Sequence, residues 1–86
     1  MTKYIYASKN KLSGNFYEPK FYDFTTESAK EQFTITALES KDPLIKELEV
    51  YYLGTFDTKT GLFVSEVEYL LDLGAIIDGA KGIQEN

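Results

Sequence analysis

The sequence predicts a small α+β domain in which an antiparallel sheet packs against one helix, in the order β-β-α-β-β. Two stretches rich in Tyr, Phe and Ile precede a segment with helical spacing, and a second pair of strand-type stretches follows it. At 86 residues, 43% of them hydrophobic, the chain can build one core. We expect this domain to span residues 1–78 and a flexible tail to span residues 79–86.

The first predicted hairpin occupies the N-terminal part of the chain. Residues 3–8 alternate with a period of two, which predicts a strand with Tyr4 and Tyr6 on one face and Ile5 and Ala7 on the other. Both sets are apolar enough to be the buried one. A polar loop over residues 9–15 then leads to a second strand over residues 16–24, where Pro19 favours an edge position or a bulge.

One helix is predicted from Thr26 to Ser40. Thr25 or Thr26 can serve as its N-cap, and Glu27 is placed favourably in the first turn. Phe33 is the expected anchor onto the sheet, with alanines four residues to either side. The helix ends before Pro43, and one further helical turn is expected over Pro43–Glu47.

The second hairpin, residues 48–64, carries the densest group of apolar and aromatic residues. Its alternation predicts that Leu48, Val50 and Tyr52 face the core, and Gly54 indicates a bulge or a close approach of another backbone. Residues 57–61 supply the turn; they could also be a fragment of a Ca²⁺ loop, but the other acidic ligands of such a loop are lacking. Residues 66–77 fit a strand or a short helix, and Gly74 would end such a helix.

The composition excludes several classes of function. Without Cys or His, the chain has no disulfide, thiolate nucleophile, imidazole base or ordinary zinc site. We therefore expect a non-catalytic protein with no cofactor and no metal. No run of residues is long and apolar enough for a membrane span, so we expect a cytoplasmic protein.

Charge is distributed unevenly along the chain. The formal net charge is −5, yet residues 1–24 carry four Lys against two acids, while residues 44–86 carry three Lys against eight. Lys and aromatic residues interleave in the first hairpin, which is the composition of a surface that binds single-stranded nucleic acid. The predicted nucleic-acid-binding residues are Lys3, Tyr4, Tyr6, Lys9, Lys11, Tyr17, Lys20 and Tyr22. Alternatively, the rings belong to the core and the lysines form a solvated edge; the chain has no Arg to read phosphates or bases.

The acidic C-terminal half supports a different hypothesis. Its carboxylates form either a solvated face or a surface for the basic patch of a partner protein. The residues concerned are Glu66, Glu68, Asp72 and Asp78. This hypothesis predicts a protein-interaction module, such as an inhibitor of a host factor.

The run LEVYYLGTFD at residues 48–57, closed by Thr60-Gly61, resembles the signature of the small non-structural protein of gokushovirus-type microviruses. The likeness extends over residues 3–64, although Thr55 and Glu31 depart from the family pattern. The resemblance implies a bacteriophage protein that is absent from the virion, binds DNA during genome replication and acts in the cytoplasm of the bacterial host. Because a sheet of this size leaves free edges and an aromatic face, we also expect a homodimer.

Overall fold

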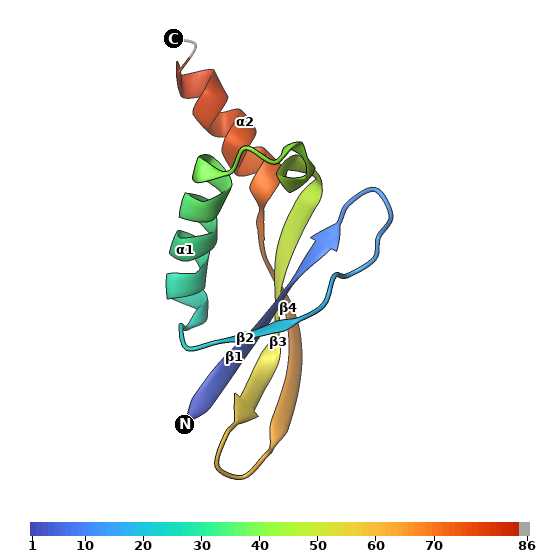
Figure 1. Cartoon of the computed structure of the whole chain (residues 1–86), viewed down its shortest axis with the longest axis vertical. Coiled ribbons are helices and arrows are strands. Elements are labelled where there is room, and N and C mark those ends of the chain that lie inside the picture. Colours follow the sequence, from blue (N-terminus) through green and yellow to red (C-terminus); the bar gives the residue numbers. More distant parts are fainter. Residues whose placement is uncertain (85–86) are drawn as a thin grey trace.

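The chain folds into a four-stranded antiparallel sheet with two helices (Figure 1), which confirms the predicted α+β class. This computed structural model describes residues 1–84, and side chains for residues 1–80. In chain order the elements are β1 (Thr2–Asn10), β2 (Lys20–Tyr22), α1 (Thr26–Glu39), the 3₁₀ helix η1 (Pro43–Glu47), β3 (Leu48–Asp57), β4 (Phe63–Asp72) and α2 (Leu73–Gln84). The predicted order is present, and α2 is added at its end.

The strands lie in the order β2-β1-β3-β4, so the N-terminal strand is in the interior of the sheet. The edge position expected for the second strand is confirmed, but the predicted length is wrong. Only Lys20–Tyr22 forms a strand, and a single bridge joins Phe16 to Lys9. Pro19 has no N–H to donate to a ladder, and it separates the bridge from the strand.

Helix α1 begins and ends almost where the sequence predicts. Thr25, which precedes the helix, and Ser40, which follows it, both have extended backbone conformations. The hydroxyls of Thr34 and Thr36 donate to the carbonyls four residues earlier, at distances of 2.6 Å and 3.0 Å, which accommodates these β-branched residues in the helix.

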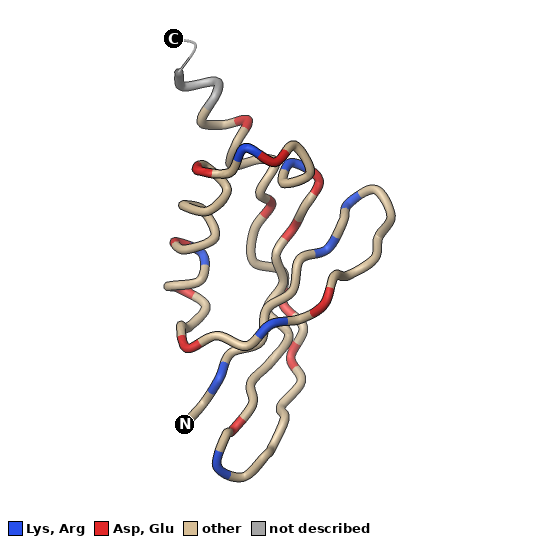
Figure 2. Tube along the Cα trace, viewed as in Figure 1, with Lys and Arg blue, Asp and Glu red and all other residues tan. Residues whose placement is uncertain are grey.

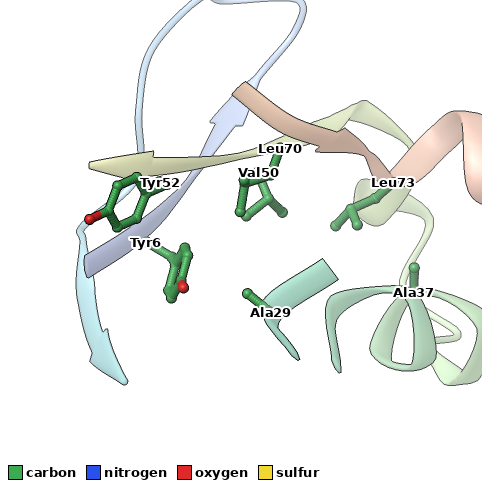
Figure 3. Packing of buried hydrophobic residues seen from close by; sticks show 7 residues of the cluster. All are labelled: Tyr6, Ala29, Ala37, Val50, Tyr52, Leu70 and Leu73. Atoms are coloured by element: carbon green, nitrogen blue, oxygen red, sulfur yellow. The ribbon is translucent and has the colours of Figure 1, made fainter. Parts of the chain in front are cut away.

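The core lies between α1 and one face of the sheet (Figure 3). It consists of Tyr6, Ala29, Ala37, Val50, Tyr52, Leu70 and Leu73. The predicted inward direction of Val50 and Tyr52 is confirmed, and Leu48 and Phe33 pack against this cluster. The helix contributes two buried alanines to this cluster, and the tyrosine rings supply much of the core volume.

Gly54 forms the bulge that the sequence predicts. Its φ is +138°, and the pairing of β3 with both neighbouring strands shifts beside it. A Cβ atom at this position would overlap the carbonyl oxygen of Val64 and lie 3.2 Å from the Cα of Ser65. The backbone of β4 therefore occupies the space that any side chain at residue 54 would need.

Residues 57–61 form the turn between β3 and β4. The Asp57 carboxylate accepts hydrogen bonds from the amides of Lys59 and Thr60, at 2.8 Å and 3.3 Å. These two hydrogen bonds lower the pKa of Asp57 below its ordinary value. Gly61 completes the turn with a φ of +77°.

The ambiguous segment over residues 66–77 is part strand and part helix. β4 continues to Asp72, whose carboxylate accepts from the Ala75 amide at 3.1 Å as α2 begins. The prediction that Gly74 ends a helix is wrong, because Gly74 lies in the first turn of α2, where a Cβ atom would overlap the Lys46 carbonyl oxygen. Residues 79–84 of the predicted tail lie in α2, and residues 85–86 lie outside the described residues.

Candidate functional site

The two faces of the sheet differ in what covers them. Helix α1 lies along one face, and α2 extends beyond the end of the sheet (Figure 1). We call the face toward α1 the helix face and the opposite one the open face. Strand alternation places Tyr6 and Tyr52 on the helix face and Tyr51 and Tyr69 on the open face.

Three of the predicted nucleic-acid-binding residues lie on the helix face as part of the core or its border. Tyr6 is only 2% exposed, and its hydroxyl donates to the carbonyl of Phe24 at 2.9 Å. Its ring centre lies 5.7 Å from each of the neighbouring ring centres, which belong to Tyr22, Phe24, Phe33 and Tyr52. Tyr4 and Tyr22 pack against the same cluster while partly exposed.

The buried Tyr6 hydroxyl gives the protein a testable dependence on alkaline pH. Burial, followed by the nearby Tyr52 and Tyr4, raises the pKa of Tyr6 from 10.0 to about 12. Because folding favours the neutral phenol, this contribution is fully present below about pH 10 and is lost as the pH rises through about 12. Urea unfolding should show that the free energy of unfolding falls between about pH 9 and about pH 12, with on the order of 2 kcal/mol of the loss due to this group. A Tyr6→Phe variant should lose less stability over the same interval, and an unchanged pH dependence in that variant would contradict the assignment.

Two of the predicted lysines are engaged in ion pairs. Lys3 pairs with Asp23, and the Lys11 ammonium lies 2.9 Å and 3.1 Å from the two carboxylate oxygens of Asp72. Burial alone would raise the pKa of Asp72, but hydrogen bonds from Lys11 and from the Ala75 amide outweigh it and lower that pKa. The Lys11–Asp72 pair thus joins the loop after β1 to the start of α2.

Lys9 lies on the open face among aromatic rings. Its ammonium is 5.5 Å from the ring centre of Phe16 and 5.4 Å from that of Tyr51, within the range of cation–π attraction. The Tyr51 ring contacts Phe16 on one side and Tyr69 on the other, with centres 5.2 Å and 5.6 Å away. Phe16 is 46% exposed and Tyr69 is 49% exposed. We call Lys9, Phe16, Tyr51 and Tyr69 the Lys9 cluster.

A second group of rings lies toward the other end of the open face. Phe21 of β2 contacts both Phe56 of β3 and Phe63 of β4, with ring centres 5.6 Å and 6.2 Å apart. Phe21 and Phe63 come from the opposite edge strands, so the sheet is curled enough here for its edges to approach each other. An apolar groove of about 360 Å³ runs beside them, lined also by Ile5 and Leu53.

The last two predicted residues, Tyr17 and Lys20, line a cavity on the helix side of the sheet. Its volume is about 240 Å³, and Tyr6 and Tyr22 also line it. The eight predicted residues therefore do not form one surface: four of them meet at this cavity, Tyr4 borders the core, Lys9 lies on the open face, and Lys3 and Lys11 are ion-paired.

The open face is close to electrically balanced, although the chain as a whole is acidic. Lys9, Glu49 and Asp72 lie side by side across three strands, and Asp72 is paired with Lys11. The alternation of β4 places Glu66 and Glu68 on the helix face of the sheet, on the same side as Tyr52. Figure 2 shows Lys recurring along β1 and the following loop, whereas acids predominate on α1, β3 and β4. Among the side chains of residues 1–80, no group of acidic residues could hold a metal ion, and no helix of the described chain is long and apolar enough to cross a membrane.

Sequence reasoning missed Tyr51 and Tyr69 as members of a candidate site. One signal was available for Tyr51, since the alternation of β3 places it opposite the core-facing Val50 and Tyr52. Tyr69 lies in the segment whose secondary structure was ambiguous, so its face could not be assigned before the pairing of β4 was known.

No protein-family model, curated protein or solved structure matches this chain.

Proposed function

We propose that this chain is a non-catalytic accessory protein that binds single-stranded nucleic acid on the open face of its sheet. The observation that carries the proposal is the Lys9 cluster, in which one ammonium lies over two rings on a face that no helix of the described chain covers. Exposed aromatic rings on an antiparallel sheet can stack with bases, and a lysine among them can contact the phosphates. The direction of Glu66 and Glu68 away from this face reduces the repulsion that a nucleic acid would meet.

The resemblance of residues 3–64 to a microvirus non-structural protein supports the same function. On this proposal the protein acts in genome replication of a bacteriophage, in the cytoplasm of the bacterial host. The proposed ligand is single-stranded DNA, because its bases are free to stack on the rings.

The test is a titration of a labelled single-stranded oligonucleotide, followed by fluorescence anisotropy at several salt concentrations. With Lys9 as the lysine that lies among the rings of the open face, the logarithm of affinity should fall with the logarithm of salt with a slope of about −0.7. Lys9→Ala should reduce the magnitude of that slope by about 0.7. Lys30→Ala, an exposed lysine on α1, is the matched control and should leave the slope unchanged.

Removal of a ring should weaken binding at every salt concentration. Tyr69→Ala is expected to lower the affinity about 5- to 150-fold, since stacking contributes about 1–3 kcal/mol per base. Leu38→Ala, an exposed apolar residue of α1, should have no effect. Absence of binding at low salt, or equal affinities for these two variants, would refute the proposal.

A second candidate function is favoured by the edge strand β4. Glu66 and Glu68 are exposed there, and within the described part of the chain neither forms an ion pair. Burial raises the pKa of Tyr52, and the charges of Glu66 and Glu68 raise it further. These carboxylates could bind a basic surface of a host protein. A pull-down should then recover a defined basic partner that the Glu66→Gln, Glu68→Gln double variant loses and a Glu27→Gln, Glu31→Gln double variant retains.

We also propose that the chain forms a homodimer through the second ring group, Phe21, Phe56 and Phe63. Phe63 is 60% exposed beside the apolar groove, and burying it in a second copy would be favourable. Sedimentation equilibrium should give twice the chain mass, and Phe63→Lys should give a folded monomer. A monomer for the unmodified chain at high concentration would exclude the dimer.

A further inference from the structure

The cavity on the helix side of the sheet is lined by residues of both layers of the fold and is partly open to solvent. Residues of β1 and β3 line it on the sheet side, and Phe33 of α1 and Leu44 of η1 line it on the helix side. The segment between β1 and β2 forms another wall, held to the sheet by a hydrogen bond from the Tyr17 amide to the Ser8 carbonyl at 2.8 Å. The lining residues are thus fixed by elements far apart in the sequence.

The size of the cavity limits what could bind there. Pockets for drug-sized ligands have volumes of about 300–1,000 Å³, and this cavity measures about 240 Å³. A single planar ring system matches this volume better than a folded peptide or a long chain. The aromatic walls, which include Tyr17, Tyr22 and Phe33, favour a flat π-system over a saturated ligand.

Charged side chains at the cavity define the rest of the ligand. Lys20 is exposed and forms no ion pair with any side chain among residues 1–80, so its ammonium is available to an anion. Glu18 also lines the cavity, and a carboxylate there can accept hydrogen bonds from an exocyclic amino group. A planar ring with an amino group, attached to a phosphate, has all of the complementary features.

We propose that this cavity binds the base of a nucleotide, with the phosphate at Lys20. The proposal rests on the proposed nucleic-acid-binding function and adds a second, separate contact to it. Phe16 belongs to the Lys9 cluster on the open face, and the next residue, Tyr17, lines the cavity. Because β2 is only three residues long, it pairs with β1 only as far as Tyr6. Over the rest of β1, the edge that faces β2 is paired at Lys9 alone, through its bridge to Phe16. A single strand that crosses this edge can stack one base on Phe16 and place a neighbouring base in the cavity.

The experiment is a titration of the full chain with dAMP, followed by two-dimensional ¹H–¹⁵N NMR. Shifts are expected at the amides of Tyr17, Lys20 and Leu44, with those of β4 unchanged. Inorganic phosphate alone should leave the amides of Tyr17 and Leu44 in place, and deoxyadenosine without phosphate should bind more weakly than dAMP. Shifts confined to the Lys9 cluster, or no shifts at all, would overturn the proposal.

Two exposed residues provide variants that should preserve the fold. Lys20→Ala should weaken dAMP binding at least about fivefold, the equivalent of one charge-assisted contact of about 1 kcal/mol. Leu44→Ala should weaken it by opening the wall of the cavity. Their matched controls on α1 are Lys30→Ala and Leu38→Ala, which should bind dAMP as the unmodified chain does. Equal affinities in a variant and its control would refute the cavity assignment.

The oligonucleotide titration separates failure of this proposal from failure of the function itself. If the oligonucleotide binds and depends on Tyr69 while dAMP does not bind, the cavity is not a base site and the open face remains the interface. If neither ligand binds, both proposals fail.

Discussion

Gly54→Ala is expected to unfold much of the protein at room temperature. The positive φ at this position costs an L-residue on the order of 1–3 kcal/mol. In addition, the new methyl group would overlap the Val64 carbonyl, which belongs to backbone and cannot rotate away as a side chain can. Relief requires β4 to separate from β3, so the total loss should exceed about 4 kcal/mol. The total free energy of unfolding of a domain of this length is roughly 4–13 kcal/mol. Far-UV circular dichroism during urea unfolding measures the change.

Gly61→Ala is the control that separates backbone strain from overlap. Gly61 also has a positive φ, +77°, but a Cβ atom there would meet no atom within 4 Å. The expected cost is therefore only the conformational part, about 1–2 kcal/mol. If the two variants were equally destabilised, the close approach of β4 at Gly54 would not be the cause.

Tyr6→Ala is expected to cost about 3–5 kcal/mol, a loss of stability second only to that of Gly54→Ala. The substitution removes a ring that is packed among four others and leaves a cavity beneath α1. Chemical denaturation should show a lower midpoint with an unchanged slope, as expected for a loss of stability without a change in the surface exposed on unfolding.

Two further variants bracket this effect. Tyr6→Phe keeps the ring and removes only the donor to the Phe24 carbonyl, so its cost should be about 1–3 kcal/mol. Tyr69→Ala removes a half-exposed ring and should cost less than Tyr6→Ala. A loss for Tyr69→Ala as large as that for Tyr6→Ala would mean that the open face is part of the folding core. Loss of nucleic-acid binding in Tyr6→Ala would carry no information about the site, because that variant is expected to be partly unfolded.

The sequence predicted most of the fold because local signals agreed with the tertiary structure. The alternation of Leu48, Val50 and Tyr52, the turn at Asp57 and the bulge at Gly54 each depend on residues close in sequence. The end of β4 did not follow from such signals. The pairing slips by one residue near Leu70, which breaks the alternation there. Gly74 lies in the first turn of α2, where the Lys46 carbonyl oxygen leaves no space for a side chain. Both features depend on contacts between distant segments.

The candidate site was harder to predict than the fold for a related reason. In β1, Tyr4 and Tyr6 alternate with Ile5 and Ala7, and both sets are suited to burial. Only the position of α1 decides that Tyr6 lies in the core. The lysines presented the same difficulty, since the partner of Lys11 is Asp72, sixty-one residues later. Composition identified the first hairpin as the place where rings and cations meet, but the register of the sheet determines which of them share a surface.

The interior position of β1 has a consequence for how the chain acquires its structure during synthesis. The first hairpin and α1 leave the ribosome before β3, yet β1 pairs along its whole length with β3, from Thr2 opposite Asp57 to Asn10 opposite Leu48. The Thr58 amide and hydroxyl then donate to the Met1 carbonyl, which joins the first residue to the turn after β3. The emerging β1, β2 and α1 therefore lack their main partner strand until about residue 58 is free, and stable folding must wait until β3 and the turn after it have been made.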